Sequence, residues 1–235
     1  MTKEEFIEKL SEHNINLSNG QIKQLDTYAL FLNEYNEKIN LTAIIEYEEV
    51  LDKHFYDSLL LSFDKEIKGT LVDVGTGAGF PGVVLKIVYP DLKVILIEPL
   101  KKRCVFLEEL IKKLDLKDIE VVNGRGEDYS INQREKYDFV TARAVSNLNT
   151  LIEVCGAMVK VDGYFIALRG LNGKEEIDGA SGAIKKMGFE IEECDDFMLD
   201  DGSKRVIAYL KKKELTPKMF PRNYSIIKRK PLWKK

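Results

Sequence analysis

Several residue types are scarce in this chain of 235 residues, which has three cysteines, two histidines and one tryptophan. Cys104, Cys155 and Cys194 stand far apart, so they make no metal-binding spacing, and their odd number argues against a disulfide framework. No apolar run approaches the roughly 18 residues of a membrane span, and the first residues carry no signal-peptide pattern. These absences predict a cytoplasmic protein with no metal site and no association with a membrane.

Acidic and basic side chains nearly balance, at a net charge of -3, but they are unevenly distributed. Residues 211–235 hold ten Lys/Arg and one acid, Glu214, which gives this segment a charge of +9 and leaves -12 on the remainder. An acidic body with a basic tail predicts a polyanionic partner, such as a nucleic acid, that is contacted at one end. The alternative is a solvated, partly frayed terminus.

The stretch from Leu71 to Gly82 is the most informative part of the chain. Its apolar, β-branched start is typical of a buried parallel strand. Gly75, Gly77 and Gly79 follow at alternate positions, where glycine allows a sharp turn and a close approach of a ligand to the backbone. Pro81 suits the first turn of a helix. The pattern of strand, glycine turn and helix predicts a nucleotide-type cofactor loop at the end of a first strand, rather than a purely structural turn.

Two details narrow the choice of cofactor. Phe80 stands where the G-x-G-x-x-G dinucleotide fingerprint requires glycine. Asp73 lies inside the predicted strand, and a buried carboxylate is rare without a partner, so we expect it to orient the loop or to meet a cationic ligand. Both details favour S-adenosylmethionine, whose amino group and sulfonium are cationic, over a dinucleotide.

The rest of the chain predicts N-terminal helices followed by an alternating α/β pattern. Capping boxes at Thr2/Glu5 and Ser18/Gln21 open two helices, and a third is predicted over 48–62. From residue 70 on, strand and helix patterns alternate, which is typical of a parallel sheet with helices on both faces. The predicted strands lie near 70–74, 93–98, 119–123, 137–142, 163–168, 189–197 and 204–210. The predicted helices lie near 81–88, 101–114, 147–159 and 174–187.

Only residues 199–203 separate the last two predicted strands, so these strands must pair antiparallel as a hairpin. A seven-stranded, mostly parallel sheet with its last strand antiparallel resembles the Rossmann-like class I fold of S-adenosylmethionine-dependent methyltransferases. We expect three parts in one compact unit: a helical segment over 1–64 packed on the core, the Rossmann-like core over 65–212, and a basic C-terminal arm over 213–235.

The predicted third helix places His54, Asp57 and Ser58 on one face, at spacings of three and four residues. This face could line a site. Taken from the residues alone, the pattern favours the simpler interpretation of a polar helix surface with local hydrogen bonds.

Two further segments suit a nucleoside cofactor. Glu98 ends the second predicted strand, where a carboxylate accepts hydrogen bonds from ribose hydroxyls; the alternative is an exposed acid at a helix start. Residues 124–128 (Gly-Arg-Gly-Glu-Asp) follow the third strand, where backbone groups and a carboxylate can read an adenine edge, leaving Arg125 for a phosphate or substrate. The alternative there is a glycine turn before a helix cap by Asp128.

Residues 141–145 (Thr-Ala-Arg-Ala-Val) follow the fourth strand and would face the transferred methyl group. The chain has neither the Asn/Asp-Pro-Pro-aromatic segment of enzymes that methylate exocyclic amines nor a Pro-Cys nucleophile. The acceptor should therefore already be nucleophilic, and guanine N7 fits because it has a free lone pair. Arg143 could hold the cofactor carboxylate or guanine O6, or it could form a buried ion pair with Asp73 or Asp138.

Together these motifs resemble the bacterial family of small-subunit rRNA guanine-N7 methyltransferases known as RsmG or GidB. The resemblance rests on 40–42 (Asn-Leu-Thr), His54-x-x-Asp57-Ser58, 73–82, 124–127 and 141–145. It covers roughly residues 25–232. It implies a cytoplasmic enzyme, acting on 16S rRNA or a small-subunit assembly particle in the decoding region.

The resemblance also implies a cofactor pocket of Gly75, Phe80, Gly126, Glu127 and Arg143. The loop and ribose arguments add Gly77 and Glu98, the positions of the cations give the RNA contacts, and a ring-nitrogen acceptor leaves catalysis to positioning. The predicted cofactor-binding residues are Gly75, Gly77, Phe80, Glu98, Gly126, Glu127 and Arg143, and the positioning candidates are Arg143 and Arg125. The predicted RNA contacts are Arg125, Arg169, Arg222, Lys228, Arg229 and Lys230. We expect a monomer whose tail is an extended arm beside the active-site rim, anchored by Phe220 and Trp233.

Four positions depart from the family pattern. Gly126 replaces an alanine, which is harmless if the backbone makes the contact, and Arg169 replaces a lysine with its charge kept. Ser225 and Ile227 replace the usual glycine and proline of the tail, which changes its expected shape but not its charge.

Two rival functions remain at this stage. A nicotinamide-dependent oxidoreductase is disfavoured by Phe80 in the fingerprint and by the lack of a Tyr-x-x-x-Lys pair. A non-catalytic rRNA-binding or assembly factor is disfavoured by the intact cofactor loop.

Overall fold

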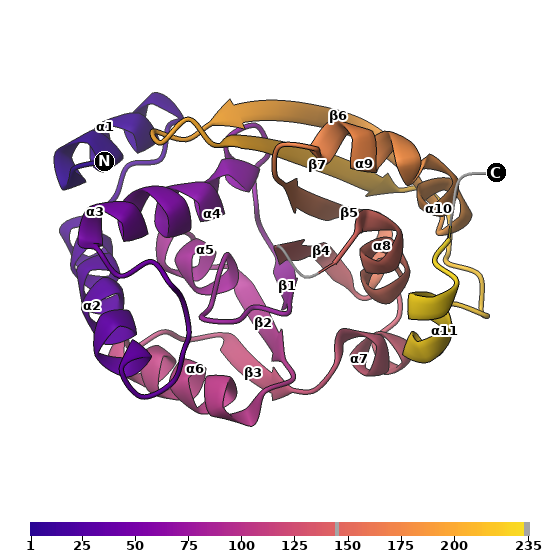
Figure 1. Ribbon diagram of the computed structural model, residues 1–235, viewed down its shortest axis with the longest axis horizontal. Helices are drawn as coiled ribbons and strands as arrows, with labels where there is room; N and C mark the ends of the chain where they lie inside the picture. The colour runs from indigo at the N-terminus through magenta and orange to yellow at the C-terminus, as the bar shows by residue number, and fades with distance from the viewer. Residues whose placement is uncertain (144–145, 233–235) are drawn as a thin grey trace.

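In residues 1–143 and 146–232, which the computed structural model describes, seven strands form one sheet in the order β3-β2-β1-β4-β5-β7-β6 (Figure 1). The strands are β1 (Thr70–Val74), β2 (Lys93–Glu98), β3 (Ile119–Asn123), β4 (Tyr137–Arg143), β5 (Val159–Arg169), β6 (Phe189–Met198) and β7 (Lys204–Lys212). Strand β7 runs antiparallel to both neighbours, and the other pairs are parallel. The predicted topology is confirmed, and β5 begins a few residues earlier than predicted.

The alternating side chains of the strands enter two apolar cores, one on each face of the sheet. Leu71 of β1 and Leu96 of β2 belong to the core beneath the N-terminal helices, whereas Val72 and Ile97 belong to the opposite core. Figure 1 shows the two helical layers on either side of the sheet, with the N-terminal helices and α11 at opposite ends. Both strand faces are therefore buried, as the continuous apolar runs of the sequence predict.

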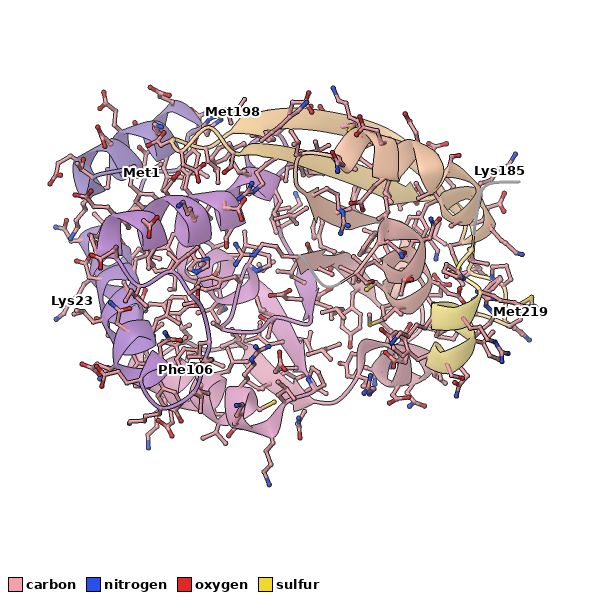
Figure 2. The ribbon with its side chains drawn as sticks, viewed as in Figure 1. Met1, Lys23, Phe106, Lys185, Met198 and Met219 are labelled. Atoms are coloured by element: carbon pink, nitrogen blue, oxygen red, sulfur yellow. The ribbon has the colours of Figure 1, made fainter. Side chains whose placement is uncertain are left out.

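The helices of the first face are α1 (Lys3–Glu12), α2 (Asn19–Asn36), α3 (Tyr47–Val50), α4 (Asp57–Leu59), α5 (Gly82–Val88) and α6 (Lys101–Lys113). Both predicted capping boxes are present, at Thr2 and Ser18. Helix α2 packs on α6 through stacked aromatic rings, with Phe106 against Phe31 (Figure 2). The N-terminal helices thus share the core of the sheet, while the division of the chain at 64/65 and 212/213 stays a prediction.

The predicted third helix is less regular than expected. A π-helical turn, Leu51–Tyr56, joins α3 to α4, and a 3-10 turn, Leu60–Ser62, ends the segment. Such π-helical turns often occur at functional sites, because they re-aim the side chains that follow them. Here the turn carries His54 and leads directly to Asp57.

The second face holds α7 (Gly126–Asn132), α8 (Leu148–Gly156), α9 (Gly173–Gly179), α10 (Ser181–Lys186) and α11 (Tyr224–Arg229). The sequence did not predict α7, and the single helix predicted over 174–187 is two. The expected extended arm is wrong over α11, which Asn223 caps by accepting a hydrogen bond from the Ser225 amide. Phe220 is buried against this face as predicted, whereas Trp233 lies outside the described residues.

No helix in the described part of the chain is both long and apolar enough to cross a membrane.

Candidate functional site

The glycine loop joins β1 to α5 at the carboxyl edge of the sheet, beside the point where the strand order reverses between β1 and β4. Ligands of open α/β sheets bind at such a point. The amides of Gly75 and Thr76 donate to the Ile97 carbonyl, at 2.8 and 3.2 Å, which fixes the loop to β2. Asp73 accepts hydrogen bonds from the Thr76 hydroxyl (2.6 Å) and the Gly82 amide (2.9 Å). Asp73 therefore orients the loop, which is one of the two roles predicted for it.

The glycines of the loop serve different purposes. Gly75, Gly77 and Gly79 all have positive φ, at 71°, 62° and 100°. A Cβ at Gly79 would lie 2.7 Å from the Tyr28 hydroxyl and from Val83, so packing excludes a side chain there. A Cβ at Gly77 would meet nothing closer than the Gly75 carbonyl at 4.0 Å. The backbone at Gly77 thus faces open space, where a ligand can approach it.

The buried carboxyl of Asp73 gives a testable pH dependence. Burial raises its pKa to about 7, against the opposing effects of Thr76, the Gly82 amide and Arg143. Because the native state binds this proton more tightly than the unfolded chain, its contribution to stability is complete below about pH 4 and is lost as the pH rises through 7. At about 1.4 kcal/mol per pKa unit, the loss is at most roughly 4 kcal/mol.

The measurement is urea denaturation of the wild type and of Asp73→Asn from pH 4 to pH 8. We expect the wild type to lose stability relative to the variant as the pH rises, by an amount that levels off above 7. A constant difference between the two proteins across this range would show that Asp73 does not titrate in it.

Glu98 is buried at the end of β2 and holds the loop from the other side. Its Oε2 accepts from the Gly77 amide (3.0 Å), its Oε1 accepts from the Leu100 amide (2.9 Å), and Arg103 lies 3.8 Å away. A carboxylate has about four acceptor positions, so two remain for further donors. The predicted ribose contact stays a prediction, and the alternative of an exposed helix acid is wrong because only 1% of Glu98 is exposed.

A hollow next to the loop lies between β1, β2, α7 and α8. Its apolar walls come from Val74, Ile97, Leu151 and Val154, and Glu127 stands at its edge. The full lining is Val74, Gly75, Ile97, Pro99, Gly124, Arg125, Gly126, Glu127, Ser146, Thr150, Leu151, Val154 and Tyr224. The structure therefore brings the predicted residues Gly75, Arg125, Gly126 and Glu127 together around one slot.

The start of α7 explains the glycine at position 126. A Cβ there would lie 2.6 Å from Val74 and 3.0 Å from Val154, so an alanine would require both side chains to shift. The alternative of a helix cap by Asp128 is wrong, because α7 already begins at Gly126. The guanidinium of Arg125 lies 5.7 Å from the ring centre of Tyr224. Tyr224 belongs to α11, and it lines the hollow on the side of that helix.

Arg143, at the end of β4, forms the centre of a second group. Its Nη1 donates to Asp57 Oδ2 (2.8 Å), and Arg205 Nε donates to Asp57 Oδ1 (2.7 Å). The interpretation of His54, Asp57 and Ser58 as a polar helix surface is wrong, since all three are buried. Arg143 does form an ion pair, but with Asp57 rather than with Asp73 or Asp138. The neighbouring Ala144 and Val145 lie outside the described residues.

Polar neighbours contact both ring nitrogens of His54. Its Nδ1 lies 3.4 Å from Arg143 Nη2, and its Nε2 lies 2.9 Å from the Thr42 hydroxyl. Burial and the charge of Arg143 lower the pKa of His54 to about 3. The Phe80 ring stacks on His54 at 4.3 Å between ring centres, and its predicted cofactor contact stays a prediction.

A pocket of about 350 Å³ opens above this group. Its lining consists of Lys53, His54, Asp57, Arg143, Leu168, Arg169, Gly170 and Arg205, and we call it the arginine pocket. Arg169 lies at the end of β5, and its Nη2 donates to Glu176. The Arg169 side chain is 91% buried and lies beside Arg143, and its predicted RNA contact stays a prediction.

The remaining predicted RNA contacts lie at α11. Arg222 is engaged by the fully buried Glu153 through its amide, Nε and Nη2, at 3.0, 2.7 and 2.7 Å. The predicted contact of Arg222 with RNA stays a prediction, because the bonds to Glu153 also give this side chain a structural role. Lys228, Arg229 and Lys230 are exposed.

Sequence reasoning missed Arg205, Lys53 and Tyr224. Arg205 could have been found from the predicted hairpin, because antiparallel pairing of β7 with β5 places Val206 opposite Arg169 at the carboxyl edge. Lys53 directly precedes His54, on the helix face that the sequence pattern indicated as a polar surface. Nothing in the local pattern around Tyr224 indicates that the tail reaches the hollow.

Comparisons with known proteins identify the family of the chain. Among curated proteins, the ribosomal RNA small subunit methyltransferase G of Lactobacillus acidophilus is 44% identical over 239 residues, covering 99% of this chain and 100% of that protein. The protein of the same name from Staphylococcus aureus is 42% identical, and the match covers 100% of both chains.

Solved structures share the fold at low sequence identity. A SAM dependent methyltransferase from Aquifex aeolicus matches with a TM-score of 0.52 at 18% identity, over 75% of this chain and 97% of that one. A variant 16S rRNA adenine-N1 methyltransferase from Catenulisporales acidiphilia matches with a TM-score of 0.52 at 14% identity, over 66% and 87%. The predicted Rossmann-like class I fold is thereby confirmed. Because the family model described as GidB, rRNA small subunit methyltransferase G, also matches residues 21–205, the chain belongs to that family.

Proposed function

We propose that this protein transfers a methyl group from S-adenosylmethionine to N7 of a guanine in 16S rRNA of the small ribosomal subunit. The names of its full-length relatives support the substrate and the reaction class. The geometry that supports it is a glycine loop, an apolar hollow beside the loop and a cationic pocket, all at one edge of the sheet.

The residues around the loop fit the cofactor. Gly77 presents its backbone to open space, Glu98 keeps free acceptor positions, and the apolar walls between Gly75 and Gly126 suit a flat base. These residues would hold the adenosine part, with Glu98 at the ribose and Glu127 at the adenine edge. When bound, S-adenosylmethionine supplies an electrophilic methyl group on its sulfonium. Arg143 is the candidate for the cofactor carboxylate.

The observation that carries the choice of N7 is the state of the acid–base groups at the pocket. Among the described lining residues, His54 is neutral and bonded at both ring nitrogens, and Asp57 is shared by two arginines. Asp73 is completely buried beneath the loop. None of these groups is placed to remove a proton. Guanine N7 attacks with its lone pair and has no proton to lose, so the chain need only position the base, for which aligned reactants can supply roughly 7–11 kcal/mol.

The proposal extends to the cellular setting. The partner is 16S rRNA or a small-subunit assembly particle, the protein acts in the cytoplasm as a monomer, and neither a metal nor a membrane takes part.

The proposal is tested by labelled methyl transfer from S-adenosylmethionine to 16S rRNA isolated from a strain that lacks this modification. We expect labelling of this rRNA and none of rRNA from the parent strain. Calorimetry should show binding of S-adenosylhomocysteine and not of NAD. Binding of rRNA and cofactor without transfer would support an assembly factor, and binding of NAD would support an oxidoreductase; either result would contradict the proposal.

The exposed cations of α11 are expected to contact the rRNA backbone. Neutralising Lys228, Arg229 and Lys230 together should weaken rRNA binding and flatten its dependence on salt, by about 0.9 in slope for each phosphate that the protein no longer neutralises. Affinity for S-adenosylhomocysteine should not change. The measurement is rRNA affinity over a series of salt concentrations.

A matched control is the neutralisation of Lys112, Lys113 and Lys117, which are equally exposed but lie where α6 ends, at the opposite edge of the sheet. If both triple variants kept the wild-type salt slope, the basic tail would be a solvated terminus.

A further inference from the structure

The arginine pocket contains a charged group whose donors are not used. Arg169 Nε and Nη1 are buried and have no hydrogen-bond partner in residues 1–143 and 146–232. The side chain is anchored by Glu176 at Nη2 alone, and it lines the pocket together with Gly170. A buried donor left unpaired costs free energy, and more so when it is charged. The unpaired N–H bonds of these two nitrogens therefore indicate an acceptor that is not part of the described chain.

The charges around Arg169 favour an anion. Four cationic side chains line the pocket against one carboxylate, and that carboxylate, Asp57, is divided between Arg143 and Arg205. The other acidic partners are Glu49 and Asp201, at Lys53, and Glu176, at Arg169. All three side chains are about a third or more exposed and lie outside the lining, so solvent screens them.

The shape of the donor set distinguishes a phosphate from the guanine base. A guanidinium presents a rigid fork that matches the oxygens of a phosphate, so one arginine can bind two of them. An arginine bound to guanine in the same way would occupy O6 and N7 together. That geometry would block the lone pair that must react. Gly170 leaves the pocket open beside Arg169, since a Cβ there would meet nothing within 4 Å.

We propose that the arginine pocket binds the phosphodiester group next to the target guanosine, with Arg169 Nε and Nη1 as direct donors and Arg205 and Arg143 as flanking charges. This inference rests on the proposed function. The pocket adjoins the glycine loop across Arg143 and Phe80, so a phosphate held there fixes the nucleotide whose base enters the site. Extruding a guanine from its stack costs a few kcal/mol. Hydrogen bonds from the pocket to the adjoining phosphate offset part of that cost.

The test combines Arg169→Gln with a 16S rRNA in which one phosphate flanking the target guanosine is a neutral methylphosphonate. We expect the variant to bind unmodified rRNA about ten- to a hundredfold more weakly, as for the loss of charge-assisted hydrogen bonds. The methylphosphonate at one flanking position should weaken wild-type binding by a similar factor and have little further effect on the variant. Arg169→Lys should restore the salt slope but not the affinity, because lysine keeps the charge and loses the fork.

Lys23→Gln is the control, because Lys23 is an exposed cation on the outer surface of α2 (Figure 2). If Arg169→Gln does not fold, the effect of the two methylphosphonate positions on wild-type binding still tests the inference. The inference is overturned if the losses from variant and methylphosphonate are additive, or if neither flanking position affects binding. Tight binding of inorganic phosphate with no effect of either methylphosphonate would assign the pocket to a free anion and would also overturn it. If the wild type binds rRNA with this dependence on the flanking phosphate but transfers no methyl group, the proposed function is contradicted and the inference about the phosphate is not.

Discussion

Replacing Asp57 with alanine is expected to lower the free energy of unfolding by about 3–5 kcal/mol, the range for removing one partner of a buried ion pair. Asp57 is 4% exposed and neutralises both Arg143 and Arg205, at 2.8 and 2.7 Å. We expect the lower end of the range, because the two arginine side chains are 18% and 24% exposed and can turn toward water. Urea denaturation at neutral pH measures the loss.

The same variant should lose methyl transfer by about a hundredfold or more, since small displacements of positioning groups have effects of that size. Glu66→Ala is the control, because Glu66 and Lys68 form an ion pair that is largely exposed, and such pairs contribute little. If Asp57→Ala were as stable and as active as Glu66→Ala, the central role of Asp57 in the pocket would be wrong.

Replacing Glu98 with alanine is expected to weaken S-adenosylhomocysteine binding by about a hundredfold, equivalent to roughly 3 kcal/mol. Two effects combine: the amides of Gly77 and Leu100 lose their acceptor, so the loop is no longer held, and the proposed ribose contact disappears. Calorimetry on the folded variant measures the change. Binding of rRNA should remain largely intact.

Glu108→Ala, on the exposed surface of α6, is the matched control. A cofactor analogue without ribose hydroxyls separates the two effects, because Glu98→Ala should then lose less affinity than it does with the natural ligand. An effect of Glu98→Ala on rRNA affinity alone would place its carboxylate at the substrate instead.

The fold and the loop could be predicted because their signals are local. The β-branched run before Gly75, the alternate glycines and the alternation of strands with helices each follow from neighbouring residues. The N-terminal capping boxes are local in the same sense, and both form. The short loop between β6 and β7 leaves no alternative to an antiparallel hairpin.

The arginine pocket could not be predicted in the same way, because its contacts join residues that lie far apart in the sequence. Asp57 and Arg205 are separated by 148 positions, and helical periodicity shows that Asp57 shares a face with His54 without showing what covers that face. Helix α7 begins with glycine, a weak helix former, and is ordered by packing against α8 rather than by its own propensity. The tail helix α11 likewise depends on burial of Ile227.

The proposed function requires that this site methylates a ring nitrogen that needs no base. The most direct test identifies the methylated atom, by digesting the labelled 16S rRNA to nucleosides and comparing the product with methylguanosine standards by chromatography and mass spectrometry. We predict 7-methylguanosine at a single position, where reduction followed by aniline treatment cleaves the RNA chain. A methyl group on N1, N2 or O6 of guanine, or on another base, would contradict it.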